Sequence, residues 1–181
     1  MLVFGNLVQL HSIAQDLASR GETLTLPADS RVGTGGGMKE LYSHRPAAII
    51  ADLEAVLRLP DGRPVPVRDV YGMAEANWAA FECEYGNYHL PPWAYFAALG
   101  EDDAIIASPR ADGMLAFLDP LGSGGLFPSF FRTADRVRLV NGGSCYDPNL
   151  VCRCGYDTTY IEGASIQRVD LVDEAGCAGQ I

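Results

Sequence analysis

The chain has 181 residues, of which 48% are hydrophobic and 20% are charged, so it is a globular protein of one domain or two small subdomains rather than a disordered one. Its formal net charge of -10 argues against non-specific binding to nucleic acid or anionic lipid. No apolar run reaches the roughly 20 residues of a transmembrane helix, and the amino terminus lacks the cationic region and cleavage site of a signal peptide. We therefore expect a cytoplasmic protein with no membrane span.

The first eighty residues alternate between strand-like and helix-like patterns. Asn6 is a good helix N-cap, Gly21 is a helix terminator, and Pro46 opens a second apolar repeat of helical period. The order β-α-β-β-α-β is typical of a parallel sheet, so we expect an α/β subdomain over residues 1–80. The expected strands are 2–5, 23–26, 31–34 and 65–70, and the expected helices are 7–20 and 46–57.

The composition changes near residue 80, after which no helical period is sustained. Short apolar runs separated by Gly, Pro and Asp predict a small antiparallel β subdomain over residues 81–181. The expected strands are 94–99, 104–107, 114–118, 137–140, 159–162 and 168–172, and the expected hairpin turns are 100–103 and 110–113.

A candidate ligand site follows the strand predicted at residues 65–70. Tyr71 and Gly72 end that strand, and Glu75 comes shortly afterwards. Ligands of open α/β sheets bind at the carboxyl ends of strands, where an aromatic ring can cover a planar base and a carboxylate can hold a metal ion that bridges phosphates. The alternative interpretation is a plain turn with an ordinary surface glutamate.

Two further segments are weaker candidates. Gly35, Gly36 and Gly37 can expose backbone groups to a ligand, although they lack the spacing of a P-loop and also fit a flexible turn. Asp135, expected at the start of a strand and flanked by cations, can accept hydrogen bonds from the vicinal hydroxyls of a ribose. Its alternative is an exposed, salt-bridged turn, which contributes little to stability.

The five cysteines are an odd number in a chain without an export signal, which favours thiols or metal ligands over disulfides. Cys83 and His89 flank one glycine-containing turn, and Cys152 and Cys154 form a short knuckle. Three thiolates and an imidazole suit a tetrahedral structural zinc, with Cys145 as the alternative fourth ligand. The competing interpretation is a set of small hydrophobic cysteines.

Cys177 lies between Gly176 and Ala178, close to the carboxyl end of the chain. Small neighbours predict a mobile, exposed thiol, which a carrier nucleophile needs. The alternative is an incidental tail cysteine.

Taken in order, four motifs resemble the adenylate-forming ligase superfamily. They are Gly-Gly-Gly-Met-Lys from residue 35, Tyr-Gly-Met-Ala-Glu from 71, Phe-Arg-Thr-Ala-Asp from 131 and Cys-Arg-Cys-Gly from 152. Residues 82–93, with the sequence ECEYGNYHLPPW, are similar to the acyl-protein synthetases, the ligase component of the fatty acid reductase of luminous bacteria. Phenylacetate-CoA ligases are near relatives. The resemblance covers nearly the whole chain.

The resemblance implies ATP and Mg²⁺ as ligands and assigns a role to each motif. The glycine triplet would line the adenine pocket, Tyr71 would stack on the adenine, and Asp135 would bind the ribose hydroxyls. Glu75 would hold Mg²⁺ beside the phosphates, and Cys177 is placed like the cysteine that receives the acyl group. The residues implied at the nucleotide are Gly35, Gly36, Gly37, Tyr71, Gly72, Met73 and Asp135.

The chain also departs from the superfamily pattern. It has no counterpart of the Ser/Thr/Gly-rich phosphate loop or of the mobile carboxyl-terminal domain with its lysine. Ala134 replaces the usual glycine before the ribose aspartate, and Tyr156 replaces a common arginine. We therefore expect the second half of an adenylating domain, with a second polypeptide supplying the phosphate loop.

The expected function is ATP-dependent activation of a carboxylic acid, with a fatty acid as the expected substrate, followed by transfer of the acyl group to a cysteine thiol. The acceptor beyond that thiol is expected to be an acyl-accepting reductase. Two alternatives stay open: an acid:CoA ligase in which coenzyme A is the acceptor, and a non-catalytic fragment that binds nucleotide or a partner.

Overall fold

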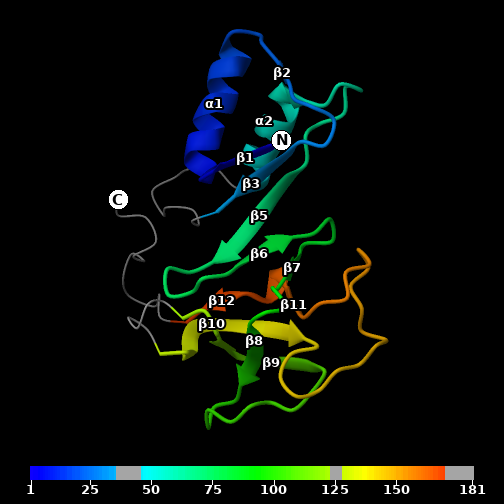
Figure 1. Ribbon diagram of the computed structural model, residues 1–181. Coiled ribbons are helices and arrows are strands. Elements are labelled where there is room, and N and C mark those ends of the chain that lie inside the picture. The colour runs from blue at the N-terminus through cyan, green and yellow to red at the C-terminus, as the bar shows by residue number, and fades with distance from the viewer. Residues whose placement is uncertain (36–45, 123–127, 170–181) are drawn as a thin grey trace. The chain divides into compact units, whose positions relative to one another are not determined.

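The computed structural model describes residues 1–35, 46–122 and 128–169 and has a mixed α/β fold (Figure 1). The described residues divide into two compact units, the first ending at Val70 and the second beginning at Tyr71. Parallel strands with helices precede an antiparallel sheet, which confirms the expected fold class. The subdomain boundary expected at residue 80 stays a prediction.

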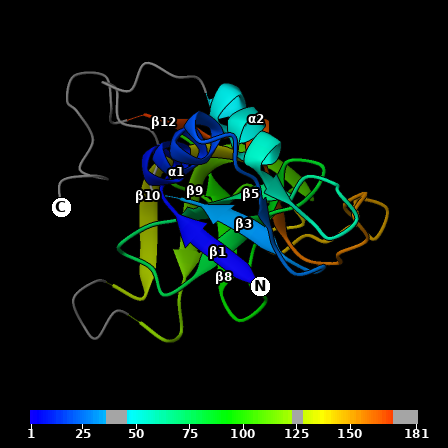
Figure 2. The same cartoon turned by 90° about the horizontal axis from the view of Figure 1, so that it is seen from above.

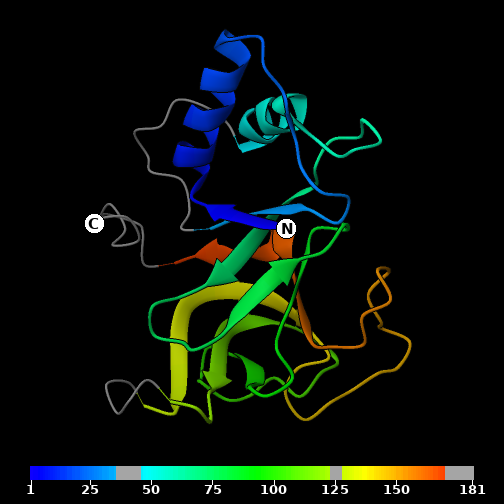
Figure 3. The same ribbon diagram turned by 45° about the horizontal axis from the view of Figure 1, so that its top comes forward.

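Unit 1 contains a small parallel sheet in the order β1-β3-β5 and a separate parallel pair, β2-β4. Figure 2 and Figure 3 both show α1 and α2 together on the same side of β1 and β3. The strand β5 begins in unit 1 and ends in unit 2. The elements are β1 (Leu2–Gly5), α1 (Leu7–Ser19), β2 (Leu24–Thr25), β3 (Arg31–Thr34), α2 (Pro46–Val56), β4 (Leu57–Arg58) and β5 (Val67–Gly72).

The ends of α1 follow from single residues. The Asn6 side chain accepts a hydrogen bond from the Gln9 N–H at 2.8 Å, which satisfies one of the free donors of the first turn. Gly21 follows the helix with φ of 65°, a conformation that costs glycine little. Leu10 and Ala14 then face the buried core of unit 1. The predicted start and end of this helix are confirmed.

Two predicted boundaries in unit 1 are wrong. The second helix ends before Leu57, because Leu57 pairs with Leu24 and opens β4. The strand predicted at residues 65–70 starts at Val67 and includes Tyr71 and Gly72, so the turn comes after this pair and not at it.

Unit 2 is an antiparallel sheet in the order β6-β7-β11-β10-β9-β8, with β12 paired to β10 (Figure 1). Within the described residues, no helix is both long and apolar enough to cross a membrane. The elements are β6 (Ala79–Glu82), β7 (Asn87–His89), β8 (Tyr95–Leu99), β9 (Arg110–Leu118), β10 (Phe130–Val140), β11 (Tyr160–Glu162), a 3₁₀ turn (Gly163–Ser165) and β12 (Gln167–Arg168).

The core of unit 2 is built around aromatic side chains. Trp78 meets Phe96 and Phe117 edge-on, with ring centroids 4.9 Å and 5.3 Å apart, a geometry that the ring quadrupoles favour. Trp78 is only 5% exposed, so the start of β6 is fixed in the core immediately after the turn that carries Glu75.

The antiparallel arrangement of this sheet is confirmed, but several of the expected strand and turn positions are wrong. Residues 110–113 are the first part of β9 rather than a turn, and residues 104–107 contribute only an isolated bridge between Leu99 and Ile105. The turn at 100–103 is confirmed by the hydrogen bond from the Asp103 N–H to the Gly100 carbonyl, at 3.1 Å. The hairpin β6–β7 was not predicted, and residues 170–172 lie outside the described residues.

Candidate functional site

An irregularity in β10 places the candidate ribose-binding aspartate. The register of β10 against β9 shifts between Arg132 and Arg136. Within this segment the Thr133 hydroxyl donates to the Leu115 carbonyl at 2.9 Å and accepts from the Asp135 N–H at 3.1 Å. Such bulges re-aim side chains next to functional sites. Asp135 therefore lies inside β10, where it is buried, and not at a strand start as expected.

Asp135 and Tyr71, which are far apart in the sequence, meet in unit 2. The Tyr71 hydroxyl donates a hydrogen bond to Asp135 Oδ2 at 2.6 Å. A short bond to a buried carboxylate is among the stronger hydrogen bonds in proteins. It fixes one carboxylate oxygen, while Oδ1 has no hydrogen-bond partner among the described residues, and the two residues form one structural group.

The environment of Tyr71 keeps its hydroxyl protonated. Burial raises the pKa of Tyr71, and the hydrogen bond to Asp135 raises it further because the neighbouring carboxylate is negative. Trp78 and Tyr88 lie at tilted angles, with ring centroids 6.0 Å and 5.9 Å away. They cover part of the Tyr71 ring, so an adenine can stack only on the part that they leave open. Stacking stays a prediction.

Glu75 lies in the turn that joins β5 to β6. The turn contains a hydrogen bond from the Ala76 N–H to the Met73 carbonyl at 3.2 Å. Glu75 is half-buried, and within the described parts of the chain its carboxylate has no hydrogen-bond or ion-pair partner. Such a group fits the requirement for a Mg²⁺ ligand, which is an oxygen anion able to turn toward a cation. Tyr71, Glu75 and Asp135 are called the carboxylate site below.

The glycine triplet is described only in part. Gly35 follows β3 in unit 1, and a Cβ added there would lie 3.4 Å from the Phe4 ring, which is an ordinary contact. Packing inside unit 1 therefore does not require glycine at this position. Gly36 and Gly37 lie outside the described residues, as does Cys177. The roles predicted for these positions stay predictions.

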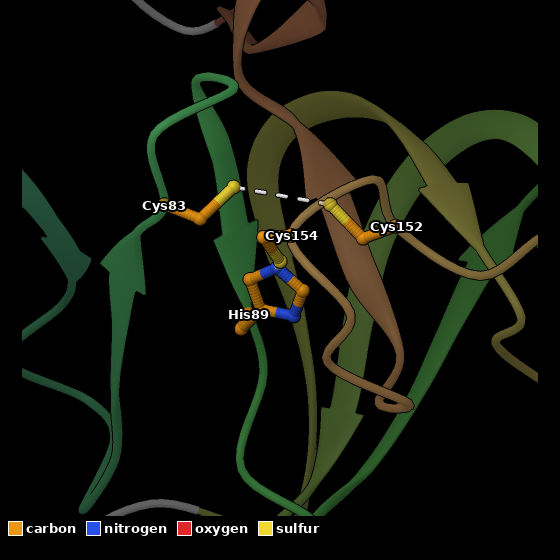
Figure 4. Close-up of side chains that lie close together, drawn as sticks. All are labelled: Cys83, His89, Cys152 and Cys154. Atoms are coloured by element: carbon orange, nitrogen blue, oxygen red, sulfur yellow. Dashed lines mark hydrogen bonds between the residues drawn. The ribbon is translucent and has the colours of Figure 1, made fainter.

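Four metal-ligating side chains gather at a second place in unit 2, and Figure 4 shows them pointing toward one another. Cys83 follows β6 and His89 is the last residue of β7, so both come from one hairpin. Cys152 and Cys154 come from the loop between β10 and β11. Together they are called the cysteine–histidine cluster. Cys145, the alternative ligand, is not in this group.

The distances within the cluster suit a tetrahedral metal. All four ligand atoms lie within 4.8 Å of one another. Cys83 Sγ and Cys152 Sγ are 3.8 Å apart, and Cys154 Sγ lies 3.1 Å from His89 Nε2. Zinc–sulfur bonds of about 2.3 Å at tetrahedral angles place two sulfurs about 3.8 Å apart. The four ligand atoms are therefore spaced nearly as a tetrahedral zinc ion requires.

Local turns present the four ligands. The Cys83 N–H donates to the Asn87 carbonyl at 2.8 Å, which closes the hairpin around Gly86. The Gly155 N–H donates to the Cys152 carbonyl at 2.9 Å, which curls the knuckle. Both glycines have positive φ, of 73° and 86°, where other residues are strained. The positive φ that each turn requires explains why Gly86 follows Cys83 and Gly155 follows Cys154.

Neighbouring groups orient the ligands and tune their ionisation. Burial lowers the pKa of His89, which favours the neutral ring that binds metals. Burial raises the pKa of Cys154 to about 11. Burial also acts to raise the pKa of Cys152, but the hydrogen bond from Asn87 Nδ2 at 3.4 Å and those from neighbouring cysteines outweigh it, so the net shift is downward. A divalent cation would favour the thiolate of all three cysteines.

One supporting residue of the cluster was missed from the sequence. Thr158 Oγ1 lies 2.9 Å from His89 Nδ1, so it can fix the ring and direct Nε2 toward Cys154. Metal-binding histidines generally have such a partner on the second ring nitrogen. The only available signal was a polar residue shortly after the knuckle, which has no diagnostic spacing.

The family model described as acyl-protein synthetase, LuxE, matches residues 1–181. The chain belongs to the acyl-protein synthetase LuxE family. The resemblance seen in its motifs is thereby confirmed. The long-chain-fatty-acid–luciferin-component ligase of Aliivibrio fischeri is 36% identical to it over 72 residues. That match covers 38% of this chain and 18% of the curated relative.

Solved structures share the fold of this family member at low identity. An amide bond synthetase McbA mutant from Marinactinospora thermotolerans matches with a TM-score of 0.54 and 17% identity, over 94% of this chain and 32% of that protein. McbA itself matches with a TM-score of 0.51 and 16% identity, over 89% of this chain and 31% of that protein. The N-terminal domain of FACL13 from Mycobacterium tuberculosis matches with a TM-score of 0.50 and 14% identity, over 88% of this chain and 38% of that domain. The chain thus spans about a third of these proteins, and the likeness extends to the fold alone.

Proposed function

We propose that this chain takes part in the ATP-dependent activation of a fatty acid as an acyl-adenylate and in its transfer to a cysteine thiol. The observation that carries the proposal is the match of the acyl-protein synthetase family over residues 1–181. The name of the Aliivibrio fischeri relative, a long-chain-fatty-acid ligase, supports a fatty acid as the substrate class.

The proposed reaction has two steps. A carboxylate oxygen of the acid attacks the α-phosphorus of ATP, the bond from that phosphorus to the oxygen bridging the β-phosphate breaks, and pyrophosphate leaves. A thiolate sulfur then attacks the acyl carbonyl carbon, the acyl–phosphate bond breaks, and AMP leaves. We propose Cys177 as the thiol, since its small neighbours suit a mobile carrier.

The carboxylate site would bind the nucleotide. Asp135 would accept a ribose hydroxyl with Oδ1, because Oδ2 is engaged by the Tyr71 hydroxyl. The open part of the Tyr71 ring would contact the adenine, together with Gly72, Met73 and the glycines at 35–37. Glu75 would hold Mg²⁺. Mg²⁺ supplies neutralisation of charge on the phosphates when bound.

We further propose that the cysteine–histidine cluster holds one structural zinc ion. Four protein ligands leave no open coordination position for water or substrate, so the site would stabilise the fold and would not catalyse the reaction. The metal would tie the β6–β7 hairpin to the loop before β11.

Other parts of the reaction need partners. The match covers 18% of the curated relative, and we propose a second polypeptide as the partner that supplies a phosphate loop. We propose a reductase as the protein that accepts the acyl group. Free coenzyme A as the acceptor, and a role limited to binding, are the competing outcomes of the test below.

The deciding experiment is ATP–pyrophosphate exchange with a long-chain fatty acid, on the 181-residue chain alone and then with the candidate second polypeptide. We expect acid-dependent exchange in the completed assembly, with acyl-Cys177 detected by mass spectrometry. Exchange by the chain alone would eliminate the purely binding role. Acyl-CoA without acyl-Cys177 would favour the coenzyme A ligase, and no exchange in either sample would refute the proposal.

A further inference from the structure

The turn after β9 contains a buried carboxylate that no part of the proposed chemistry uses. Asp119 is only 4% exposed, and its backbone N–H donates to the Ser129 carbonyl at 3.0 Å. The Gly122 N–H donates back to the Asp119 carbonyl at 3.1 Å. Within the described residues, Asp119 has no ion-pair partner. A buried charge is costly unless hydrogen bonds compensate it, so its partners are informative.

The two carboxylate oxygens of Asp119 have different partners. Oδ1 accepts the Leu121 N–H at 2.9 Å, which is a local cap of its own turn. Oδ2 accepts the Asn77 N–H at 3.0 Å, from a residue 42 positions earlier in the chain. The Asn77 side chain also donates, to the Gly122 carbonyl. Asn77 therefore joins its turn to residues 119–122 with two hydrogen bonds, and it is the donor in both.

Asn77 belongs to the turn that carries Glu75. That turn begins at the end of β5, and Trp78 fixes its far end in the aromatic core. Between these ends, the Asp119 carboxylate accepts the N–H of the residue two positions after Glu75. The local cap of residues 119–122 uses only Oδ1 of Asp119. The bond from the Asn77 N–H to Oδ2 is therefore the one that restrains the Glu75 turn.

We propose that Asp119 is a positioning residue that holds the Glu75 turn in the conformation in which Glu75 binds Mg²⁺. The inference rests on the proposed function, because it requires Glu75 to be the metal ligand. Asp119 itself contacts neither metal nor nucleotide in this scheme. Its charge makes the bond to Asn77 stronger than a neutral acceptor would.

The variant that isolates this role is Asp119→Ser. A serine hydroxyl can still cap its own turn but is too short to reach Asn77 as well. The matched control is Asp102→Ser, because Asp102 Oδ1 also caps a local turn, through the Ala104 N–H at 3.2 Å, in an exposed hairpin. Asp119→Asn, which preserves the shape and removes the charge, serves if the serine variant does not fold.

The first measurement is amide hydrogen exchange, which needs no enzymatic activity. We expect Asp119→Ser to speed exchange at residues 73–77 by about tenfold or more, as the loss of a charge-assisted hydrogen bond allows. Asp102→Ser should leave these residues unchanged. Unchanged protection at 73–77 in both Asp119 variants would overturn the inference, while wild-type pyrophosphate exchange would still stand as evidence for the proposed function.

The second measurement is the Mg²⁺ dependence of pyrophosphate exchange in the active assembly. We expect Asp119→Ser to raise the half-saturating Mg²⁺ concentration by about tenfold, with recovery at excess Mg²⁺, as for other supporting residues of metal sites. In a Glu75→Gln background, Asp119→Ser should cause almost no further rise in the half-saturating Mg²⁺ concentration, since both substitutions act through the Glu75 carboxylate. A loss that Mg²⁺ does not rescue, or that multiplies with Glu75→Gln, would assign Asp119 a purely structural role and overturn the inference.

Discussion

The two candidate sites of unit 2 differ in how completely the described residues build them. The cysteine–histidine cluster has all four ligands within 4.8 Å of one another, together with supporting groups on His89 and Cys152. The carboxylate site has one firm contact, from Tyr71 to Asp135, and a glutamate whose carboxylate is free within the described part of the chain. The cluster therefore has all its ligand atoms near one point, whereas the carboxylate site has one contact between two of its three residues.

This difference fits the role proposed for each site. A structural metal contributes most when its ligands are fixed and closed to solvent. A site for an exchangeable nucleotide must admit and release its ligand, so some of its groups must be able to move. The predictions below test whether the two sites differ in this way.

The largest expected effect is the loss of the metal from the cluster. Cys152→Ser should lower the zinc content from about one equivalent to a small fraction and reduce the unfolding free energy by several kcal/mol, on the order of other structural zinc sites. Elemental analysis and thermal unfolding measure both. Cys145→Ser, which alters a cysteine outside the cluster, should change neither. Wild-type protein with under about a tenth of an equivalent of zinc would contradict the prediction.

Cys177→Ser should abolish the acylated protein and leave the first step, adenylate formation, intact. We expect stable acylation of the protein to stop, because a serine hydroxyl is a much weaker nucleophile than a thiolate, while adenylate formation continues. Mass spectrometry of the acylated protein and pyrophosphate exchange report the two steps separately. Cys145→Ser is the control with an intact carrier thiol. Undiminished thioester on the Cys177→Ser protein would show that another cysteine carries the acyl group.

Glu75→Gln should reduce adenylate formation by about 100-fold or more, since even supporting residues of metal sites are worth about 10- to 100-fold. The substitution preserves size and removes the charge that would bind Mg²⁺. Glu84→Gln, at an exposed residue of the β6–β7 turn, is the matched control and should be near wild type. An adenylate yield for Glu75→Gln that equals wild type at saturating Mg²⁺ would rule out this role.

Tyr71→Phe should give the smallest effect. Removing the hydroxyl leaves the buried Asp135 without its donor, so we expect a loss of about 1–3 kcal/mol in unfolding free energy and a few-fold weaker ATP affinity. Chemical denaturation and nucleotide binding measure these quantities. Tyr146→Phe removes the same kind of bond, to Asp157, at the surface and should have little effect. Tighter ATP binding by Tyr71→Phe would instead show that the hydroxyl competes with the ribose.

The sequence predicted best where a local rule decides the structure. The side chain of Asn6 and the free conformation of Gly21 set the limits of α1 without help from the rest of the fold. The cluster was found in the same way, because each half of it is a local pair in a tight turn.

The sequence failed where distant packing overrides local preference. Arg110 to Gly113 has the composition of a turn, but it pairs along β10 and continues β9. A Cβ at Gly113 would lie 2.4 Å from the Leu99 carbonyl oxygen, so this glycine is needed for the close approach of a neighbouring strand. Asp119 was missed for a similar reason, because its second partner is distant in the sequence.

The separation of the cluster's two halves has a consequence for protein synthesis. Cys83 and Cys152 are 69 positions apart, so a ribosome adding about 5–20 residues per second exposes the hairpin cysteine roughly 3–14 s before its partner. During that interval the nascent chain presents only two of the four cluster ligands, Cys83 and His89, which are too few to retain a metal against cellular competitors. Capture of the proposed metal would then await the pairing of β11 with β7, which brings Tyr160 opposite His89. The metal supply at the end of translation, rather than at its start, would then decide which ion the protein contains.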